Sequence, residues 1–164
     1  MQTGTRQTVR FSVVALGLVV ALAGSVLAQA NNPSIGVWKG NLAKSKFAPG
    51  TAAVSFGLKV ETAGAGTKST VDSASADGTV RHWVYTTNYD GKESPIVGNC
   101  QWGDTVAVTR VDANNSRSVY KLKGTLTVTQ TSAVSADGKT RTVATKGKNA
   151  LGQTVDNVNV YDKQ

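Results

Sequence analysis

Apolar and polar residues alternate with a period of two along much of the chain. The clearest run extends from Val54 to Val60, where every second residue is a large apolar side chain. Shorter runs of the same kind cover residues 105–109 and 125–129. A period of two is typical of a β-strand with one buried face. We expect further strands at residues 66–74, 79–88, 115–123, 140–147 and 153–162.

Turn sequences separate these runs. Asp-Gly dipeptides favour the positive φ angles that tight hairpin turns need. About nine short strands joined by such turns form an antiparallel up-and-down meander. We therefore predict an all-β antiparallel barrel of about 8–10 strands, because closure removes exposed strand edges; a β-sandwich is the alternative. The turn sequences are Asp77-Gly78, Asp90-Gly91, Ala113-Asn114-Asn115, Asp137-Gly138 and Leu151-Gly152.

The first strand is expected to begin at Gly36-Val37-Trp38. Trp38 is predicted to plug the closed end of the barrel, beside a glycine that lets the backbone pack closely. Helix is expected only as one or two turns at residues 41–47, which Pro49-Gly50 ends. The sequence thus predicts one β-barrel domain over residues 35–164.

The first 28 residues have the layout of a secretory signal peptide. Arg6 and Arg10 precede an apolar run from Phe11 to Val26, and small residues near Ala28 suit cleavage. The run is short for a membrane span and is interrupted by glycine and serine. We expect an exported protein, periplasmic or secreted, with no stable membrane anchor and with a flexible mature N-terminus at residues 29–34.

Charge and cysteine content narrow the partners. The chain has 18 basic and 10 acidic residues, so without Arg6 and Arg10 the net charge is about +6. The lysines are spread along the strands and do not alternate with aromatic residues, so we expect no nucleic-acid partner. Cys100 is the single cysteine, which excludes an intramolecular disulfide. One cysteine and one histidine do not make a zinc cluster, and we expect no metal or cofactor. The sequence leaves the oligomeric state open.

Several segments resemble an uncharacterised family of small exported bacterial proteins, and the likeness extends over nearly all of residues 36–164. The resemblance implies membership of that family and no particular activity. The segments that carry it are 36–50, His82-Trp83-x-Tyr85-Thr86, Tyr89-Asp90-Gly91-Lys92, Asp137-Gly138-Lys139-Thr140 and Val160-Tyr161-Asp162-Lys163-Gln164.

A looser resemblance is to the calycins, the lipocalins and intracellular fatty-acid-binding proteins. Gly36-x-Trp38-Lys39 is similar to their first strand, and Val160-Tyr161-Asp162-Lys163 is similar to the last strand of the fatty-acid binders. The resemblance implies a calycin-like barrel. The fatty-acid binders usually carry an arginine two residues before that tyrosine, whereas this chain has Asn159. The resemblance therefore supports the barrel more than any particular ligand.

The candidate ligand-binding residues are Trp83, Tyr85, Arg81 and Arg110. Arg81, Trp83 and Tyr85 share one face of a predicted strand, where they offer an apolar surface with a cation near its rim. Ordinary packing of the aromatic rings in the core is the alternative. Arg110 and Arg141 lie on faces that carry valines, and an inward arginine is costly unless it is paired. We expect both to lie in solvent at the barrel mouth, with a pocket contact as the alternative.

No motif in the chain supports a reaction. His82 lies opposite Trp83 on its strand and is expected to be exposed, without a nearby nucleophile motif. Neither a glycosidase carboxylate pair, a calcium loop, a phosphate-binding glycine loop nor Gly-x-Ser-x-Gly is present. Catalysis is the lowest-ranked function because a barrel can still assemble a site from distant strands.

Two other functions remain. The first is non-catalytic, lipocalin-like binding of a small apolar or amphipathic, lipophilic ligand inside the barrel. The second is an envelope or extracellular interaction protein whose barrel interior is solid. A cavity of several hundred Å3 would favour the binder, and an interior filled by side chains would favour the second function.

Overall fold

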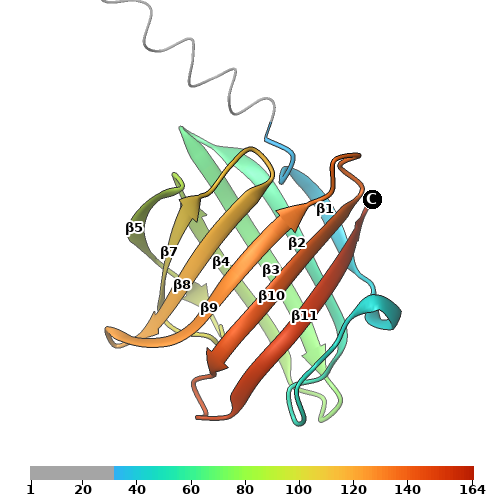
Figure 1. The fold of residues 1–164 in the computed structure, drawn as a ribbon. Coiled ribbons are helices and arrows are strands. Elements are labelled where there is room, and N and C mark those ends of the chain that lie inside the picture. Colours follow the sequence, from blue (N-terminus) through green and yellow to red (C-terminus); the bar gives the residue numbers. More distant parts are fainter. Residues whose placement is uncertain (1–31) are drawn as a thin grey trace, which may run out of the picture.

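One antiparallel sheet coils into a nearly closed barrel in the computed structural model, which describes residues 32–164 (Figure 1). The described chain contains eleven strands and one turn of 3-10 helix, η1, at Leu42–Lys44. The strands are β1 Gly36–Gly40, β2 Ala53–Ala63, β3 Gly66–Ser75, β4 Val80–Thr87, β5 Asp90–Pro95, β6 Val97–Gly98, β7 Thr105–Arg110, β8 Asn115–Leu122, β9 Thr125–Val134, β10 Thr140–Lys148 and β11 Thr154–Lys163.

The strand order is that of an up-and-down barrel. Neighbours around the sheet run β5-β7-β8-β9-β10-β11-β1-β2-β3-β4-β6. The first and last strands therefore pair, with Lys39 opposite Asp162. This arrangement confirms the predicted all-β antiparallel barrel over the alternative sandwich, and it is compatible with a calycin-like barrel.

The barrel is interrupted between β4 and β5, which follow each other in the chain but do not pair. β5 pairs with β7, and β4 is covered on that side only by the short β6. Asp90-Gly91, expected to form a hairpin, instead begins β5, and the chain turns one residue earlier at Tyr89, whose φ is 59°. The prediction of a hairpin there was wrong, because the strands on either side belong to opposite edges of the sheet.

The other predicted turns form hairpins. Gly78 and Gly138 both have positive φ, at 83° and 70°, as Asp-Gly turns require. Residues 111–114 join β7 to β8, and 149–153 join β10 to β11. Lys123 and Gly124 form the turn between β8 and β9 with φ of 49° and 78°.

The apolar face of β2 is shorter than its sequence suggests. Phe56, Leu58 and Val60 are buried, but Val54 is 51% exposed. The pairing of β2 with β3 shifts register between Ala53 and Ser55. A bulge of this kind turns the strand by one residue, so it reverses the facing of the residues before it. Placing Val54 in the core was wrong for this reason.

Trp38 lies fully buried among apolar side chains of β2, β9, β10 and β11. Its Nε1 donates a hydrogen bond of 2.8 Å to the carbonyl of Ser34. The Nζ of Lys163 lies 5.1 Å from the centre of the Trp38 ring. Asn32 and Ser34 are themselves buried, so residues 32–34 fold against the barrel where the sequence suggested a flexible N-terminus. The proposed signal peptide, residues 1–28, lies outside the described residues.

Within residues 32–164, helix is confined to η1, as the sequence predicted for this segment, and Asn41 caps it by accepting a hydrogen bond from the Lys44 amide. The described residues include no helix that is long and apolar enough to cross a membrane.

Candidate functional site

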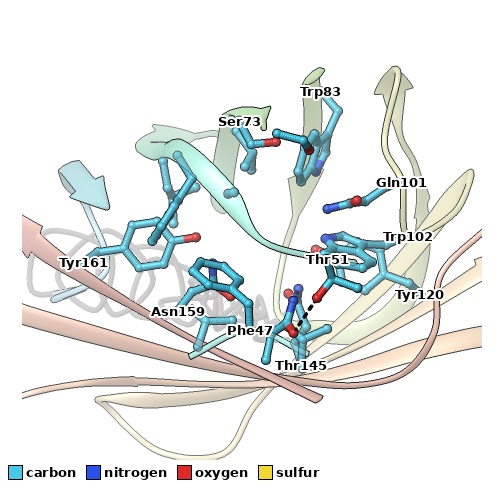
Figure 2. Close-up of a pocket in the computed structure, with 18 of the residues that line it drawn as sticks. Phe47, Thr51, Ser73, Trp83, Gln101, Trp102, Tyr120, Thr145, Asn159 and Tyr161 are labelled. Atoms are coloured by element: carbon cyan, nitrogen blue, oxygen red, sulfur yellow. Dashed lines mark hydrogen bonds between the residues drawn. The ribbon is translucent and has the colours of Figure 1, made fainter. Parts of the chain in front are cut away.

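A cavity lies inside the barrel, toward the end where β2 and β11 begin and β3 ends (Figure 2). Its volume is about 70 Å3. Pockets for drug-sized ligands measure roughly 300–1,000 Å3. The cavity is therefore small, and side chains fill most of the barrel interior.

Aromatic side chains make up much of the cavity wall. Trp83, Trp102, Tyr120 and Tyr161 project toward it from different sides of the barrel (Figure 2). Phe56 packs edge-on against Tyr161, with ring centres 4.9 Å apart. These flat apolar surfaces suit a ligand with an apolar or planar body.

Polar side chains from β9, β10 and β11 also line the cavity. They include Gln130, Thr145, Asn157 and Asn159. Gln130 donates a hydrogen bond of 3.1 Å to the Thr145 hydroxyl. The cavity thus combines apolar surfaces with fixed hydrogen-bonding groups.

Asn157 holds a loop across the mouth of the cavity. Its Oδ1 accepts hydrogen bonds from the Ala48 amide, at 2.7 Å, and from the Thr51 hydroxyl, at 2.9 Å. Phe47, in the same loop, lines the cavity and packs edge-on against Phe56 at 6.0 Å. A ligand that enters from this end has to pass this loop.

Arg141 is the one charged side chain among the cavity-lining residues of the described chain. It is 9% exposed and lies opposite Tyr161 in the register of β10 and β11. Its Nε donates a hydrogen bond of 2.9 Å to the Ser132 hydroxyl, and its buried Nη1 has no hydrogen-bond partner. The expectation that Arg141 lies in solvent at the barrel mouth was wrong, because the inner face of β10 stays buried at this position.

Three tyrosines that line the cavity are strongly desolvated. Burial raises the pKa of Tyr85 and Tyr161, the latter to about 12, while the positive charge of Arg141 acts in the opposite direction on both. Burial also raises the pKa of Tyr120 well above its ordinary value. All three side chains are therefore neutral phenols near pH 7.

Trp83 supplies a second unsatisfied donor. Its side chain is 4% exposed, and its buried Nε1 has no hydrogen-bond partner. Buried indole N–H groups usually find one. The cavity wall therefore carries two buried donors, one on β4 and one on β10, that the described side chains do not satisfy.

The four predicted ligand-binding residues do not all meet at this cavity. Trp83 and Tyr85 line it. Arg81 lies beside it, where its Nη1 donates to the hydroxyl of Ser75, 2.9 Å away. Arg110 ends β7 at the opposite end of the barrel, exposed, with its guanidinium 4.1 Å from the centre of the Tyr89 ring. Of Arg110 and Arg141, for which a pocket contact was the alternative, Arg141 is the one that points inward.

His82 and Cys100 stand outside the cavity lining. His82 is exposed, and its Nδ1 lies 2.7 Å from Oδ1 of Asp72, the residue opposite it on β3. Burial raises the pKa of the Cys100 thiol to about 11, so the thiolate is scarce near neutral pH. Within residues 32–164, no group of three or more His, Cys, Asp and Glu side chains could hold a metal ion.

No protein-family model matches the chain, and no curated protein matches it either. The interpretation of the cavity therefore rests on its own geometry.

Proposed function

We propose that this protein binds a small amphipathic molecule inside the barrel and catalyses no reaction on it. The observation that carries the proposal is the interior cavity, where aromatic rings face polar side chains and two buried donors lack partners. Unsatisfied buried donors are costly, and a bound ligand with acceptor atoms would remove that cost. The loose calycin resemblance points to the same class of function.

The cavity volume sets the size of the ligand. About 70 Å3 does not hold a long lipophilic chain. The proposal therefore narrows the expected ligand class to compact molecules with an apolar body and a polar group.

The small cavity also favours a second candidate function, an envelope or extracellular interaction protein with a nearly solid interior. Under that function the cavity holds only water, and partners bind the outer surface. Both candidates place the protein outside the cytoplasm, on the strength of the sequence of residues 1–28. Neither involves nucleic acid or a membrane anchor.

Native mass spectrometry of the purified protein separates the two candidates. A reproducible small-molecule adduct supports the binder, and its loss on mild unfolding locates the molecule inside the fold. Quenching of tryptophan fluorescence by a panel of compact amphipathic compounds extends the test, because Trp83 and Trp102 line the cavity.

A cavity-filling variant provides the control. Ser73→Leu adds volume at a residue that lines the cavity, whereas Ser55→Leu adds the same volume at an exposed position on β2. We expect Ser73→Leu alone to abolish adduct and quenching. Equal binding by both variants and the wild type would show that the ligand lies elsewhere and would overturn the proposal.

A further inference from the structure

We propose that the cavity is a receptor for a small monocarboxylate, whose carboxylate pairs with the guanidinium of Arg141. This inference rests on the proposed function, because it specifies the charge and size of the ligand in that same cavity.

Burial of the Arg141 charge without a charged partner has an electrostatic cost. A guanidinium stays protonated in proteins, so Arg141 does not escape burial by losing its charge. Burying a charge is costly unless the charge is paired. Arg141 is 9% exposed, and its Nη1 makes no hydrogen bond.

The described residues that line the cavity supply no counterion for Arg141. No aspartate or glutamate is among the described residues that line the cavity, and Arg141 takes part in no ion pair of the described chain. Its hydrogen-bonding neighbour is the neutral hydroxyl of Ser132. The negative charge that balances Arg141 therefore has to come from a bound molecule.

The geometry and charge of the Arg141 guanidinium favour a carboxylate over other anions. A guanidinium forms parallel hydrogen bonds to the two oxygens of a carboxylate, and such charge-assisted pairs are among the strong ones in proteins. Arg141 is the only cation among the described lining residues, so a doubly charged phosphate would keep one charge uncompensated. A single negative charge matches the site.

The walls define the rest of the ligand. Tyr161, which lies opposite Arg141, and Phe56, which packs against Tyr161, present apolar ring surfaces. The indole N–H of Trp83 on β4 can donate to a further acceptor. With a volume of about 70 Å3, the site takes a short-chain or single-ring acid. Longer acids would have to displace the loop that Asn157 holds.

The test compares acids with their uncharged amides of the same shape. Propionate with propionamide, and benzoate with benzamide, are titrated by calorimetry and by tryptophan fluorescence. We expect at least one acid to bind the wild type about ten- to a hundredfold more tightly than its amide, as for a hydrogen-bonded charge pair. The preference should disappear as the pH falls below the pKa of the free acid.

Three variants locate the charge. Arg141→Gln should remove the preference for the acid over its amide, and Arg141→Met serves the same purpose if the glutamine variant does not fold. Arg141→Lys should weaken acid binding, because an ammonium lacks the planar fork. Arg110→Gln is the matched control outside the cavity and should change nothing.

Each outcome bears on one of the two proposals. Equal affinity for acids and amides, or a preference that survives Arg141→Gln, would overturn the carboxylate site while the proposed binding function stands. Failure of both acids to bind would overturn the carboxylate site, whereas the binding function itself is overturned only by the adduct and quenching tests on Ser73→Leu and Ser55→Leu. Chloride that binds as tightly as either acid would also overturn the inference, because it would identify a halide site.

Discussion

Gly40 ends β1 directly beneath the ring of Phe56. A Cβ atom at this position would lie 2.5 Å from the Phe56 carbonyl oxygen and 2.6 Å from two of its ring carbons. Phe56 is itself held by Phe47 on one side and Tyr161 on the other. The ring therefore has little freedom to move away, and the position accepts only glycine.

We expect Gly40→Ala to lower the free energy of unfolding by about 1–3 kcal/mol, the usual cost of overpacking a filled core. Gly57→Ala is the matched control, because its Cβ would meet only the Trp38 carbonyl oxygen at an ordinary 3.6 Å. Urea unfolding measures both. Equal destabilisation by the two substitutions would contradict the steric explanation.

At single positions, the sequence predicted which way a side chain points better than it predicted what surrounds that side chain. The alternation on β4 placed Trp83 and Tyr85 together, and both do line the cavity. The same reasoning could not separate Arg110 from Arg141, because each shares a face with valines. Burial separates them in the structure: Arg110 is the last residue of β7 and is exposed, while Arg141 is the second residue of β10 and is buried.

Hairpin turns set the register of the strands that they join. The turn between β8 and β9 places Lys123 at φ 49° and Gly124 at φ 78°. Two consecutive positive φ angles are those of a type I′ turn, in which asparagine at the first position is preferred. Lysine at this position is strained, and its hydrogen bonds to the Asp104 carboxylate come from the backbone amide, which asparagine would keep.

We expect Lys123→Asn to raise the free energy of unfolding by about 0.5–1 kcal/mol by relieving this strain. Lys139→Asn removes the same charge beside the turn at Gly138, where the lysine φ is not positive, and should have a smaller effect. Chemical denaturation of the two variants and the wild type makes the comparison. An equal gain in both variants would assign the effect to charge and not to the turn.

The elements that the sequence missed are β5 and β6. Neither β5, which ends at Pro95, nor the two-residue β6 has the apolar alternation of the other strands. Their burial is low, so hydrophobic pattern carries no signal for them. The prediction of a hairpin at Asp90-Gly91 was wrong for a related reason. A turn sequence does not reveal whether the strands on either side of it pair.

The buried tyrosines make the stability of the whole barrel depend on pH in the alkaline range. The pKa of Tyr161 is raised to about 12, and those of Tyr85 and Tyr120 are raised too, each chiefly by burial. The unfolded chain loses these protons from about pH 10 upward, whereas the folded chain retains them. The folded state therefore binds more protons in this range, and its stability falls as the pH rises.

We expect the buried tyrosines to have no effect on the pH dependence of the free energy of unfolding below about pH 9. Between about pH 10 and 12 they should make the free energy of unfolding fall. Tyr161→Phe should make the fall shallower, by up to about 2 kcal/mol at the upper end. A Cys100→Ala background removes the buried thiol, whose pKa is also raised. Urea unfolding across this pH range measures the slope. An unchanged slope in Tyr161→Phe would contradict the assignment.

At the scale of the molecule, alternation and turns were enough to predict a barrel. They could not predict its cavity. The volume left inside depends on how the rings of Phe47, Phe56 and Tyr161 interlock across three separate segments. The bulge at Ala53 and the loop that Asn157 holds also shape that space, and neither leaves a period in the sequence.

Because β4 and β5 do not pair, the chain can be opened between them without disrupting a pair of strands. The two chain ends that the structure describes lie close together, since the amide of Gln164 donates to the Val37 carbonyl at 2.9 Å. A short linker from Gln164 to Asn32 and new termini between Asn88 and Tyr89 would give a circular permutant with every strand ladder intact. We expect it to fold with near-native stability, whereas new termini at Gly124 would separate the paired β8 and β9 and lower the melting temperature.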